Sequence, residues 1–385
     1  MMRRTVYLDH NATSPPAPAV LREMYDAMER TWANPSSTHE PGQAARRVLA
    51  DARARVAAFL GCAGNELVFT SCATEANHSA VLGALKARAA EGRRRWVLSA
   101  VEHPGLLALA ARLEAEGVPV TRLPVDGHGR LDLAVARAAI GGDVALVSLM
   151  AANNETGVCM PVPEVGALTQ AAGAWLHVDA TQLAGKGPLA FAGSGVDLLA
   201  VSAHKLQGPK GTGALVIRKG RVLPPLLPGR QERQRRGGTE NVAGIAGFAA
   251  ACEIAAATLP DDVARTARLR DRLEHALLAL PGTHVYGRGV PRLANTCCLR
   301  FGELDADLVL TRLERGGVVA SSGAACSAGG TQPSHVLLAM GESPARAKAG
   351  VRFSLGRGTT DADIDQAIAA AHVALAPLLN QEALA

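Results

Sequence analysis

The chain has 385 residues, of which 48% are hydrophobic, and its formal net charge is +5. A chain of this length exceeds a usual single domain, so we expect a large domain and a smaller companion. The mild charge and the small number of aromatic residues, with three Trp and three Tyr, give little scope for base stacking and argue against direct nucleic-acid binding.

The seven cysteines include no C-x-x-C pair and form no even framework. This usage suits a reducing cytoplasm and argues against a structural zinc site. The start of the chain runs directly into a motif rather than an apolar stretch, so we expect no signal peptide. The longest apolar run, 242–259, is rich in alanine and contains Cys252 and Glu253, which predicts a buried helix rather than a membrane span.

Short apolar runs alternate with helical stretches through the middle of the chain. Uniformly apolar runs are typical of strands whose two sheet faces are both covered, so the pattern predicts a mostly parallel sheet wrapped by helices. A break at 259–262, followed by an arginine-rich helical pattern, is the expected domain boundary. The apolar runs lie at Val68, Val97, Val120, Val147, Leu176 and Leu199.

The segment 67–77 is predicted to form a strand, a turn of small residues and a helix that begins near Thr74. The first turn of a helix presents free N–H groups and the positive end of the helix dipole, which suits a phosphate. Thr74 followed by Glu75 is also an ordinary helix start, so the pattern alone is weak evidence for an anion site. Ser202 and His204, after a later strand, supply further donors for the same group.

Another apolar run, 174–180, ends in Asp179 and is followed by Gln182. Ligands of open parallel sheets bind beyond the carboxyl ends of the strands, so Asp179 and Lys205 are expected to face one crevice. A carboxylate in this place can pair with a protonated ring nitrogen, as the Asp partner of a pyridoxal phosphate ring does. A helix N-cap is the alternative role for Asp179.

Lys205 stands where an apolar strand ends in Ser, His and Lys and then breaks into glycines. It is one of only six lysines among 40 basic residues. A lysine at a buried strand end loses hydration, which favours the neutral amine that Schiff-base chemistry requires. A loop lysine that contacts solvent is the alternative, and the expected neighbour Asp179 favours the Schiff-base role.

Taken in order, these segments resemble the cysteine desulfurases of the pyridoxal phosphate-dependent class V aminotransferase superfamily, and the resemblance runs nearly end to end. It implies the type I fold of pyridoxal phosphate enzymes. A large α/β domain at 15–260 would hold a mostly parallel sheet with helices on both faces, and 1–14 with 261–385 would form a smaller α+β domain. The segments that carry the resemblance are 7–13, 34–39, 70–77, 102–103, 153–157, 177–182, 202–205, 235–241, 321–327 and 352–357.

The resemblance implies pyridoxal 5′-phosphate as cofactor, bound covalently by Lys205. Asp179 would pair with the ring nitrogen, and Gln182 would donate to the phenolic oxygen. His103 would lie over the ring face and serve in proton transfer. The residues expected to hold the phosphate are Ala73, Thr74, Ser202, His204 and, from the second subunit of a homodimer, Thr239. The substrate carboxylate is expected at Asn154, which also borders the cofactor, and at the two-pronged guanidinium of Arg352.

Cys326 distinguishes a desulfurase from an aminotransferase, because sulfur abstraction needs a nucleophile that accepts a sulfur atom. It lies in the glycine-rich stretch 316–330, where a thiol could visit the cofactor and then turn outward. A buried small residue is the alternative reading of such a cysteine. By resemblance, Cys326 would take sulfur from L-cysteine, leave L-alanine and carry a persulfide, which makes it a candidate transient iron–sulfur ligand.

The expected partner is a sulfur-acceptor protein, an iron–sulfur scaffold, with no membrane and no direct nucleic acid involved. Two related alternatives stay open: a selenocysteine lyase, and a desulfurase that supplies tRNA thiolation or another sulfur-containing product. Acceptor preference and the ratio of selenide to sulfide release distinguish them. An alternative of another class is a catalytically silent assembly subunit that binds pyridoxal phosphate, and intact Lys205, Asp179 and Cys326 argue against it.

Overall fold

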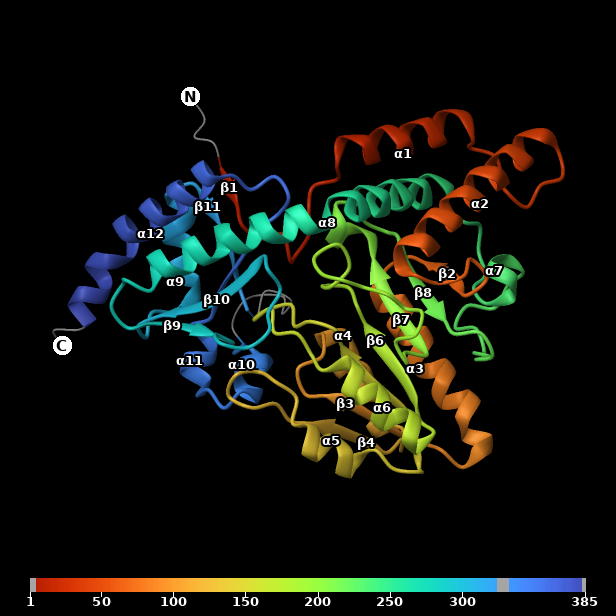
Figure 1. Ribbon diagram of the computed structural model, residues 1–385, viewed down its shortest axis with the longest axis horizontal. Helices are drawn as coiled ribbons and strands as arrows, with labels where there is room; N and C mark the ends of the chain where they lie inside the picture. Colours follow the sequence, from red (N-terminus) through yellow and green to blue (C-terminus); the bar gives the residue numbers. More distant parts are fainter. Residues whose placement is uncertain (1–4, 324–331, 383–385) are drawn as a thin grey trace.

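The computed structural model describes residues 5–323 and 332–382 and shows two lobes (Figure 1). The larger lobe is built on a seven-stranded sheet, and the smaller lobe contains a two-stranded and a four-stranded sheet. The first and last helices or strands of the described chain, β1 and α12, lie in the smaller lobe (Figure 1). The helix α8 (Val242–Leu277) runs across both lobes.

All six predicted apolar runs form strands of the large sheet, which confirms the expected α/β architecture. One further strand, β8, lies antiparallel to both of its neighbours, whereas the pairs from β7 to β4 are parallel. In sheet order the strands are β2 (Leu67–Thr70), β8 (Gly213–Ile217), β7 (Leu198–Ser202), β6 (Trp175–Asp179), β5 (Val144–Met150), β3 (Arg95–Ser99) and β4 (Val120–Leu123).

Both faces of this sheet are covered. Within β7, Leu198 and Ala200 belong to one hydrophobic cluster, and Leu199 and Val201 belong to another on the opposite face. This alternation follows from the two-residue period of a strand, and it explains why the predicted runs are apolar throughout. The helices of the lobe are α1 (Pro18–Arg30), α2 (Glu40–Leu60), α3 (Ala73–Arg88), α4 (Pro104–Ala115), α5 (Leu133–Ala139), α6 (Val162–Ala172) and α7 (Gln231–Gln234), with 3₁₀ turns η1 (Ala89–Glu91) and η2 (Ala203–Leu206).

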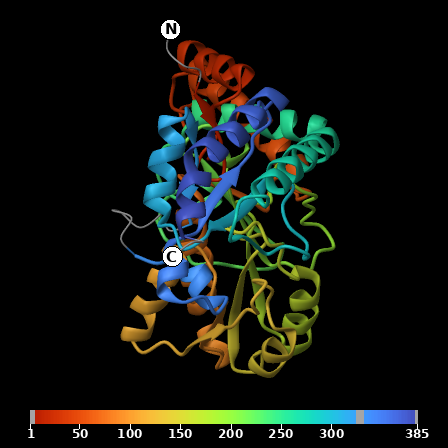
Figure 2. The same ribbon diagram turned by 90° about the vertical axis from the view of Figure 1, so that its left-hand side faces the viewer.

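Figure 2 looks onto the smaller lobe, whose helices lie toward the viewer. The N-terminal strand β1 (Val6–Tyr7) pairs in parallel with β11 (Val318–Val319), so the start of the chain lies in this lobe. The four-stranded sheet has the order β12 (Ser321–Ser322), β13 (Val351–Ser354), β10 (Thr296–Phe301) and β9 (Thr283–Tyr286). The helices are α9 (Ala306–Arg315), α10 (His335–Ala339), α11 (Pro344–Lys348) and α12 (Asp361–Glu382).

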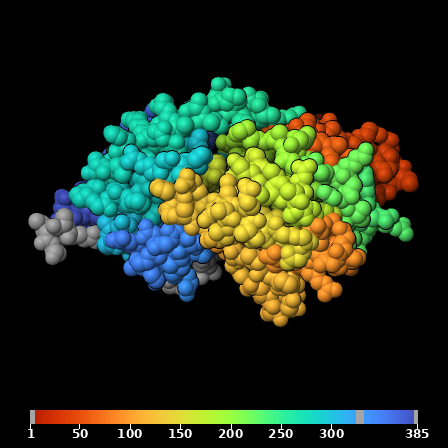
Figure 3. Space-filling model, turned by 60° about the horizontal axis from the view of Figure 1, so that its bottom comes forward, coloured from red at the N-terminus to blue at the C-terminus, as the bar shows by residue number. Residues whose placement is uncertain are grey.

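The two lobes touch along their length. On the underside of the molecule, the segment between β4 and α5 lies against the C-terminal lobe (Figure 3). A Cβ placed on Gly129 would lie 3.4 Å from the sulfur of Met340. The backbone N–H of Leu293 donates to the carbonyl of Gly157 at 2.8 Å. These contacts hold the smaller lobe beside the carboxyl ends of the large sheet.

The helix α8 continues through Pro260 to Leu277, so the chain has no break in secondary structure at 259–262. The domain boundary expected there stays a prediction: α8 residues up to Ala255 belong to the core of the larger lobe, and those from Leu269 belong to the core of the smaller lobe. Proline removes one backbone donor from a helix, so the local sequence favours a break. The turn around Pro260 is held together by side chains: Thr258 donates to Asp262 at 2.6 Å, and Arg357 of the smaller lobe forms an ion pair with Asp262 at 2.7 Å. The helix therefore links the lobes instead of ending between them.

The prediction that 242–259 is a buried helix is confirmed for most of its first half, where Gly244 to Cys252 are buried. By length and composition, α8 and α12 are apolar enough to cross a membrane. Core helices of folded proteins pass the same test, and α8 packs into the hydrophobic clusters of both lobes.

Packing of α8 in the smaller lobe gives a stability prediction. Leu273 is fully buried on α8, whereas Leu308 on α9 is 39% exposed. We expect Leu273→Ala to lower the free energy of unfolding by about 2–5 kcal/mol through lost burial and a residual cavity. Leu308→Ala, the matched control, should change it by less than about 0.5 kcal/mol. Chemical denaturation measures both, and equal losses would contradict the packing.

Candidate functional site

A cavity lies at the carboxyl ends of β5, β6 and β7, where ligands of open α/β sheets bind. Its wall comes from the N-terminal segment, the first turns of α3 and α4, the strand ends and β13 of the smaller lobe. The structure brings ten predicted residues to this wall: Ala73, Thr74, His103, Asn154, Asp179, Gln182, Ser202, His204, Lys205 and Arg352.

Two predicted residues are not on this wall. Thr239 follows α7 and is exposed, away from the cavity of its own chain. Its expected place in the other subunit of a homodimer therefore stays a prediction. Cys326 lies outside the described residues, which end at Gly323 before it and resume at Gln332.

Lys205 stands on η2, directly after β7, and its amine reaches the N-terminal segment. Its Nζ donates to the carbonyl oxygens of Asn11 at 2.6 Å and Ala12 at 2.7 Å. Both acceptors are backbone atoms of another cavity-lining segment. The amine is thus held at the cavity wall by two backbone carbonyl groups.

Asp179 ends β6 and is 7% exposed. Its two oxygens each accept one hydrogen bond, from Asn77 Nδ2 at 2.7 Å and from the backbone N–H of Thr181 at 2.9 Å. Gln182 is also buried, and its Nε2 donates to the carbonyl of Asn11 at 3.0 Å. The carboxylate therefore has a defined orientation at the end of its strand.

His103 is the N-cap of α4, where its Nδ1 accepts from the backbone N–H of Gly105 at 3.1 Å. Burial lowers the pKa of His103, so the neutral ring dominates. In a neutral ring that accepts at Nδ1, the proton lies on Nε2. His103 is therefore a neutral imidazole on the cavity wall with an N–H donor at Nε2.

The opposite part of the wall suits a phosphate. The first turn of α3 contributes Ala73 and Thr74, and amides in the first turn of a helix have no acceptor within the helix. The hydroxyl of Ser202 is buried and has no hydrogen-bond partner among the described residues. His204 accepts from or donates to Thr13 Oγ1 at 3.1 Å, and burial lowers its pKa to about 4.

These groups fit the cofactor that the sequence implies. Burying a hydroxyl without a partner costs about 1–3 kcal/mol, so Ser202 is explained by an acceptor bound in the cavity. Asn154 Oδ1 and Thr181 Oγ1 are likewise buried without a partner among the residues that the structure describes. An amine, a carboxylate and an anion-binding turn around one cavity match the aldehyde, ring nitrogen and phosphate of pyridoxal phosphate.

Arg352 reaches the cavity from β13 and already has a carboxylate partner. Its Nη2 forms an ion pair with Asp9 Oδ1 at 2.6 Å, and its Nη1 donates to the carbonyl of Asn154 at 2.9 Å. Its Nε is buried without a partner in the described part of the chain. Asp9 and Asn154 thus orient the guanidinium, and Nε–H remains as a donor for a further anion.

Two buried carboxyl groups flank the cavity without lining it. Burial raises the pKa of Glu102 to about 8, and its Oε1 accepts from the backbone N–H of Met150 at 2.7 Å. Burial also raises the pKa of Glu155 to about 7, with Arg352 opposing the shift. Glu155 accepts from Ser334 Oγ, directly before α10. Ionising either carboxyl group costs free energy, because neither has enough contact with water to solvate the negative charge.

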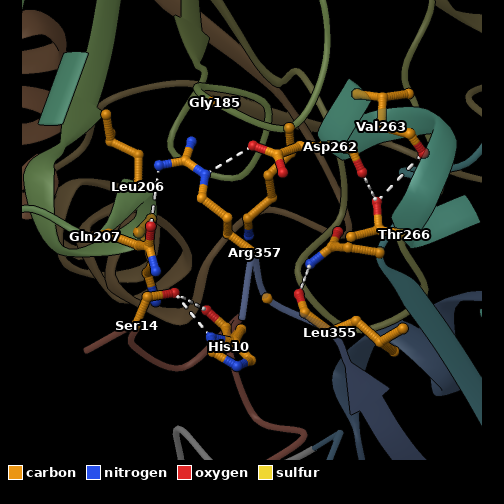
Figure 4. Close-up of a pocket in the computed structure, with 14 residues that line it drawn as sticks. His10, Ser14, Gly185, Leu206, Gln207, Asp262, Val263, Thr266, Leu355 and Arg357 are labelled. Carbon is orange, nitrogen blue, oxygen red and sulfur yellow. Dashed lines mark hydrogen bonds and ion pairs between the residues drawn. The ribbon is translucent and has the colours of Figure 1, made fainter. Parts of the chain in front are cut away.

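A second cavity, which Lys205 also lines, lies at the seam between the lobes. Figure 4 shows this cavity. Arg357 spans this seam: its Nε forms an ion pair with Asp262, and its Nη1 donates to Gln207 Oε1 at 3.1 Å. His10 and Ser14 are hydrogen-bonded at 3.2 Å, and burial lowers the pKa of His10 to about 4. This cavity therefore lies between the two lobes and next to Lys205.

Sequence reasoning missed four residues that hold the site together. Asp9 and Asn11 lie inside a motif that carried the family resemblance, and Asn77 ends another, but no role followed from the motifs alone. Lys186 donates to Gln182 Oε1 at 2.6 Å and to Asn11 Oδ1 at 2.8 Å. The spacing of four residues between Gln182 and Lys186 could have indicated this contact, because side chains at that spacing meet in a helical turn.

Comparison with known proteins agrees with this geometry. The family model described as "Aminotransferase class-V" matches residues 6–367. A protein named "Cysteine desulfurase" from Rhodobacter capsulatus is 47% identical over 96% of this chain and 96% of its own length. A "Cysteine desulfurase" from Cereibacter sphaeroides is 45% identical over 98% of this chain and 96% of its own length.

Solved structures show the same fold. A structure titled "NIFS-LIKE PROTEIN" has a TM-score of 0.89 and 34% identity, and the match covers 96% of this chain and 99% of that one. A structure titled "SspA in complex with cysteine" has a TM-score of 0.81 and 30% identity, with 92% of this chain and 100% of that one covered.

Glu102 gives a prediction for stability against pH. Its pKa is about 8 in the folded protein against an ordinary 4.5, so the unfolded chain releases this proton first as pH rises. As pH rises from about 4.5 to about 8, the group should lower the free energy of unfolding by up to about 1.4 kcal/mol per pH unit. Glu102→Gln should reduce that slope, measured by denaturation at several pH values. Glu314→Gln, at an exposed site, is the control, and an unchanged slope in Glu102→Gln would refute the assignment.

Proposed function

This chain belongs to the aminotransferase class-V family and is a pyridoxal phosphate-dependent cysteine desulfurase, and we propose that it passes the sulfur of L-cysteine through Cys326 to an acceptor protein of iron–sulfur cluster assembly. The observation that carries the site assignment is the convergence of Lys205, Asp179 and Arg352 on one cavity. Lys205 and Asp179 come from two strand ends of the large lobe, and Arg352 comes from β13 of the smaller lobe.

Lys205 would bind the cofactor, Asp179 would face its ring nitrogen, and Ser202 with the first turn of α3 would hold its phosphate. Bound pyridoxal phosphate supplies an electron-withdrawing ring that stabilises negative charge at the α-carbon of an attached amino acid. The orientation of Asp179 by Asn77 and Thr181 supports its role, because a carboxylate with both oxygens already hydrogen-bonded has little freedom to turn away.

Arg352 would bind the carboxylate of L-cysteine, with Asn154 beside it. The buried Nε–H of Arg352 and the buried amide oxygen of Asn154 both lack partners among the described residues, which supports a polar substrate at this place. Asp9 neutralises part of the guanidinium charge before substrate binds. Substrate affinity is then set by hydrogen-bond geometry as well as by charge.

Lys205 would take the substrate α-proton after its amine is released, since the carbonyls of Asn11 and Ala12 keep the amine at the cavity wall. His103 would serve as a proton donor through Nε2–H. Its Nδ1 is engaged by the N–H of Gly105, so only Nε2 carries the exchangeable proton in the neutral ring.

The thiolate of Cys326 would attack the substrate sulfur. A sulfur–sulfur bond forms as the carbon–sulfur bond breaks, and the electron pair of the broken bond stays with carbon. Carbon then takes up a proton and leaves as L-alanine, while Cys326 carries the persulfide. The persulfide sulfur passes to a thiol of the acceptor, which returns Cys326 to its starting state.

A homodimer would complete the phosphate site through Thr239 of the second subunit. The exposed position of Thr239, away from its own cavity, supports this arrangement. We also propose that the enzyme works in the cytoplasm. The six cysteines among the described residues are all free, as expected in a reducing compartment.

Replacing the thiol tests sulfur transfer. Native enzyme given L-cysteine and a thiol reductant should release sulfide and alanine in equal amounts, whereas Cys326→Ala should release neither. Both products are quantified from the same reaction. Cys62→Ala is the control, since Cys62 lies in a groove beside α2 rather than at the cofactor cavity, and its variant should keep full activity. Sulfide release by Cys326→Ala at the native rate would refute the persulfide route.

Arg352→Lys tests carboxylate binding. A lysine keeps the charge and loses both the Nε–H donor and the fork that Asp9 and Asn154 orient, so kcat/KM for L-cysteine should fall about tenfold or more, mainly through KM. Arg268→Lys, at an exposed ion pair with Asp361, should leave both constants unchanged. Steady-state alanine formation measures the two variants, and an unaltered KM in Arg352→Lys would remove Arg352 from the substrate site.

A further inference from the structure

A chain of four buried side chains leads from Asp179 to the far edge of the core. Asn77 on α3 donates from Nδ2 to Asp179 at 2.7 Å, and its Oδ1 lies 3.0 Å from His177 Nε2. His177 Nδ1 lies 3.1 Å from Ser148 Oγ. Trp96 Nε1 donates to Ser148 Oγ at 2.9 Å. Of these four residues, the function assigned to the site uses only Asn77, through its bond to Asp179; His177, Ser148 and Trp96 have no part in it.

Sheet geometry places the chain on one face. His177 and Asp179 are two residues apart on β6, so their side chains leave the strand on the same side. Ser148 pairs with His177 in the ladder between β5 and β6, and β3 carries Trp96 on the next strand (Figure 1). The helix α3 packs on this face and brings Asn77 over the strand ends.

The proton positions along the chain follow from its ends. A carboxylate only accepts, so Asn77 Nδ2 donates to Asp179 and Asn77 Oδ1 accepts from His177 Nε2–H. The neutral ring then accepts at Nδ1 from the hydroxyl of Ser148, whose oxygen accepts from the indole N–H of Trp96. The opposite amide orientation would place Asn77 Oδ1 against a carboxylate oxygen.

Burial makes this arrangement rigid. Asn77 is 4% exposed, and Ser148, His177 and Trp96 are fully buried. Burial lowers the pKa of His177 to about 4, so the ring is neutral and has a single ring proton to place. Buried polar networks with every member satisfied hold one arrangement, because any alternative leaves a donor or an acceptor without a partner.

We propose that Asn77, His177 and Ser148 are positioning residues that hold the Asp179 carboxylate toward the cofactor ring, with Trp96 donating to Ser148 at the end of the chain of bonds. The proposal rests on the role assigned above to Asp179. It makes cofactor retention depend on Ser148, a side chain that does not line the cofactor cavity.

Ser148 is the informative place to break the chain. Without its hydroxyl, the ring proton of His177 is free to move to Nδ1, and Nε2 then faces Asn77 as an acceptor. The amide of Asn77 is then free to turn, and Asp179 loses its donor. Ser148→Ala therefore acts on the cofactor through three residues, with no direct contact.

The test is the rate at which holoenzyme loses pyridoxal phosphate on dilution, followed by its visible absorption, together with the pH midpoint of that absorption. Ser148→Ala should release the cofactor about threefold to tenfold faster than native enzyme, as expected for one lost hydrogen bond, and should shift the midpoint. Ser148→Cys keeps the size and a weak S–H donor, so its rate should lie between the two.

Thr169→Val is the matched control, because Thr169 is a buried hydroxyl on α6 that donates to the carbonyl of Gly166 outside the chain of residues. Its cofactor release should match native enzyme even where thermal stability falls. Native release rates in Ser148→Ala, or equal acceleration in Thr169→Val, would overturn the proposal. If Ser148→Ala does not fold, Ser148→Cys decides in the same way.

Asp179→Asn, measured in parallel, separates this inference from the function it rests on. Altered release in Asp179→Asn with native release in the Ser148 variants refutes the positioning role alone. Unaltered release and an unaltered pH midpoint in Asp179→Asn refute the role of Asp179, and the positioning role with it.

Discussion

One buried asparagine near the start of the chain joins the parts on which this enzyme depends. Asn11 is 1% exposed and uses its carbonyl, its amide oxygen and its amide nitrogen at once. Because each bond needs the others in place, the N-terminal segment can take its position only when both lobes are folded around it. Its partners are Lys205, Gln182, Lys186, Asn295, Asn154 and Thr296.

This constraint explains how the lobes share the chemistry. The large lobe supplies the cofactor end of the cavity through the ends of its parallel strands, and the smaller lobe supplies Arg352 from β13. Asn154, on the large lobe, accepts from Arg352 and from Asn11, so it lies where the three parts meet. The ion pair of Arg357 with Asp262 adds a second link behind Lys205.

Burial decides the charge states around the cavity. Histidines such as His177 and His204 are held neutral by desolvation, and Glu102 resists ionisation for the same reason. The charged guanidinium of Arg352, by contrast, has an oppositely charged partner in Asp9.

By itself, the sequence determined the α/β class, the six apolar strands, the family and ten residues of the cavity wall, because period and local motif encode these features. Only the tertiary structure decided that α8 continues through Pro260, that Asp9 pairs with Arg352, and that Asn77 reaches Asp179. These contacts join residues about 100 or more positions apart, or depend on side chains across a turn. Strand register and lobe packing set them, and no local pattern records either.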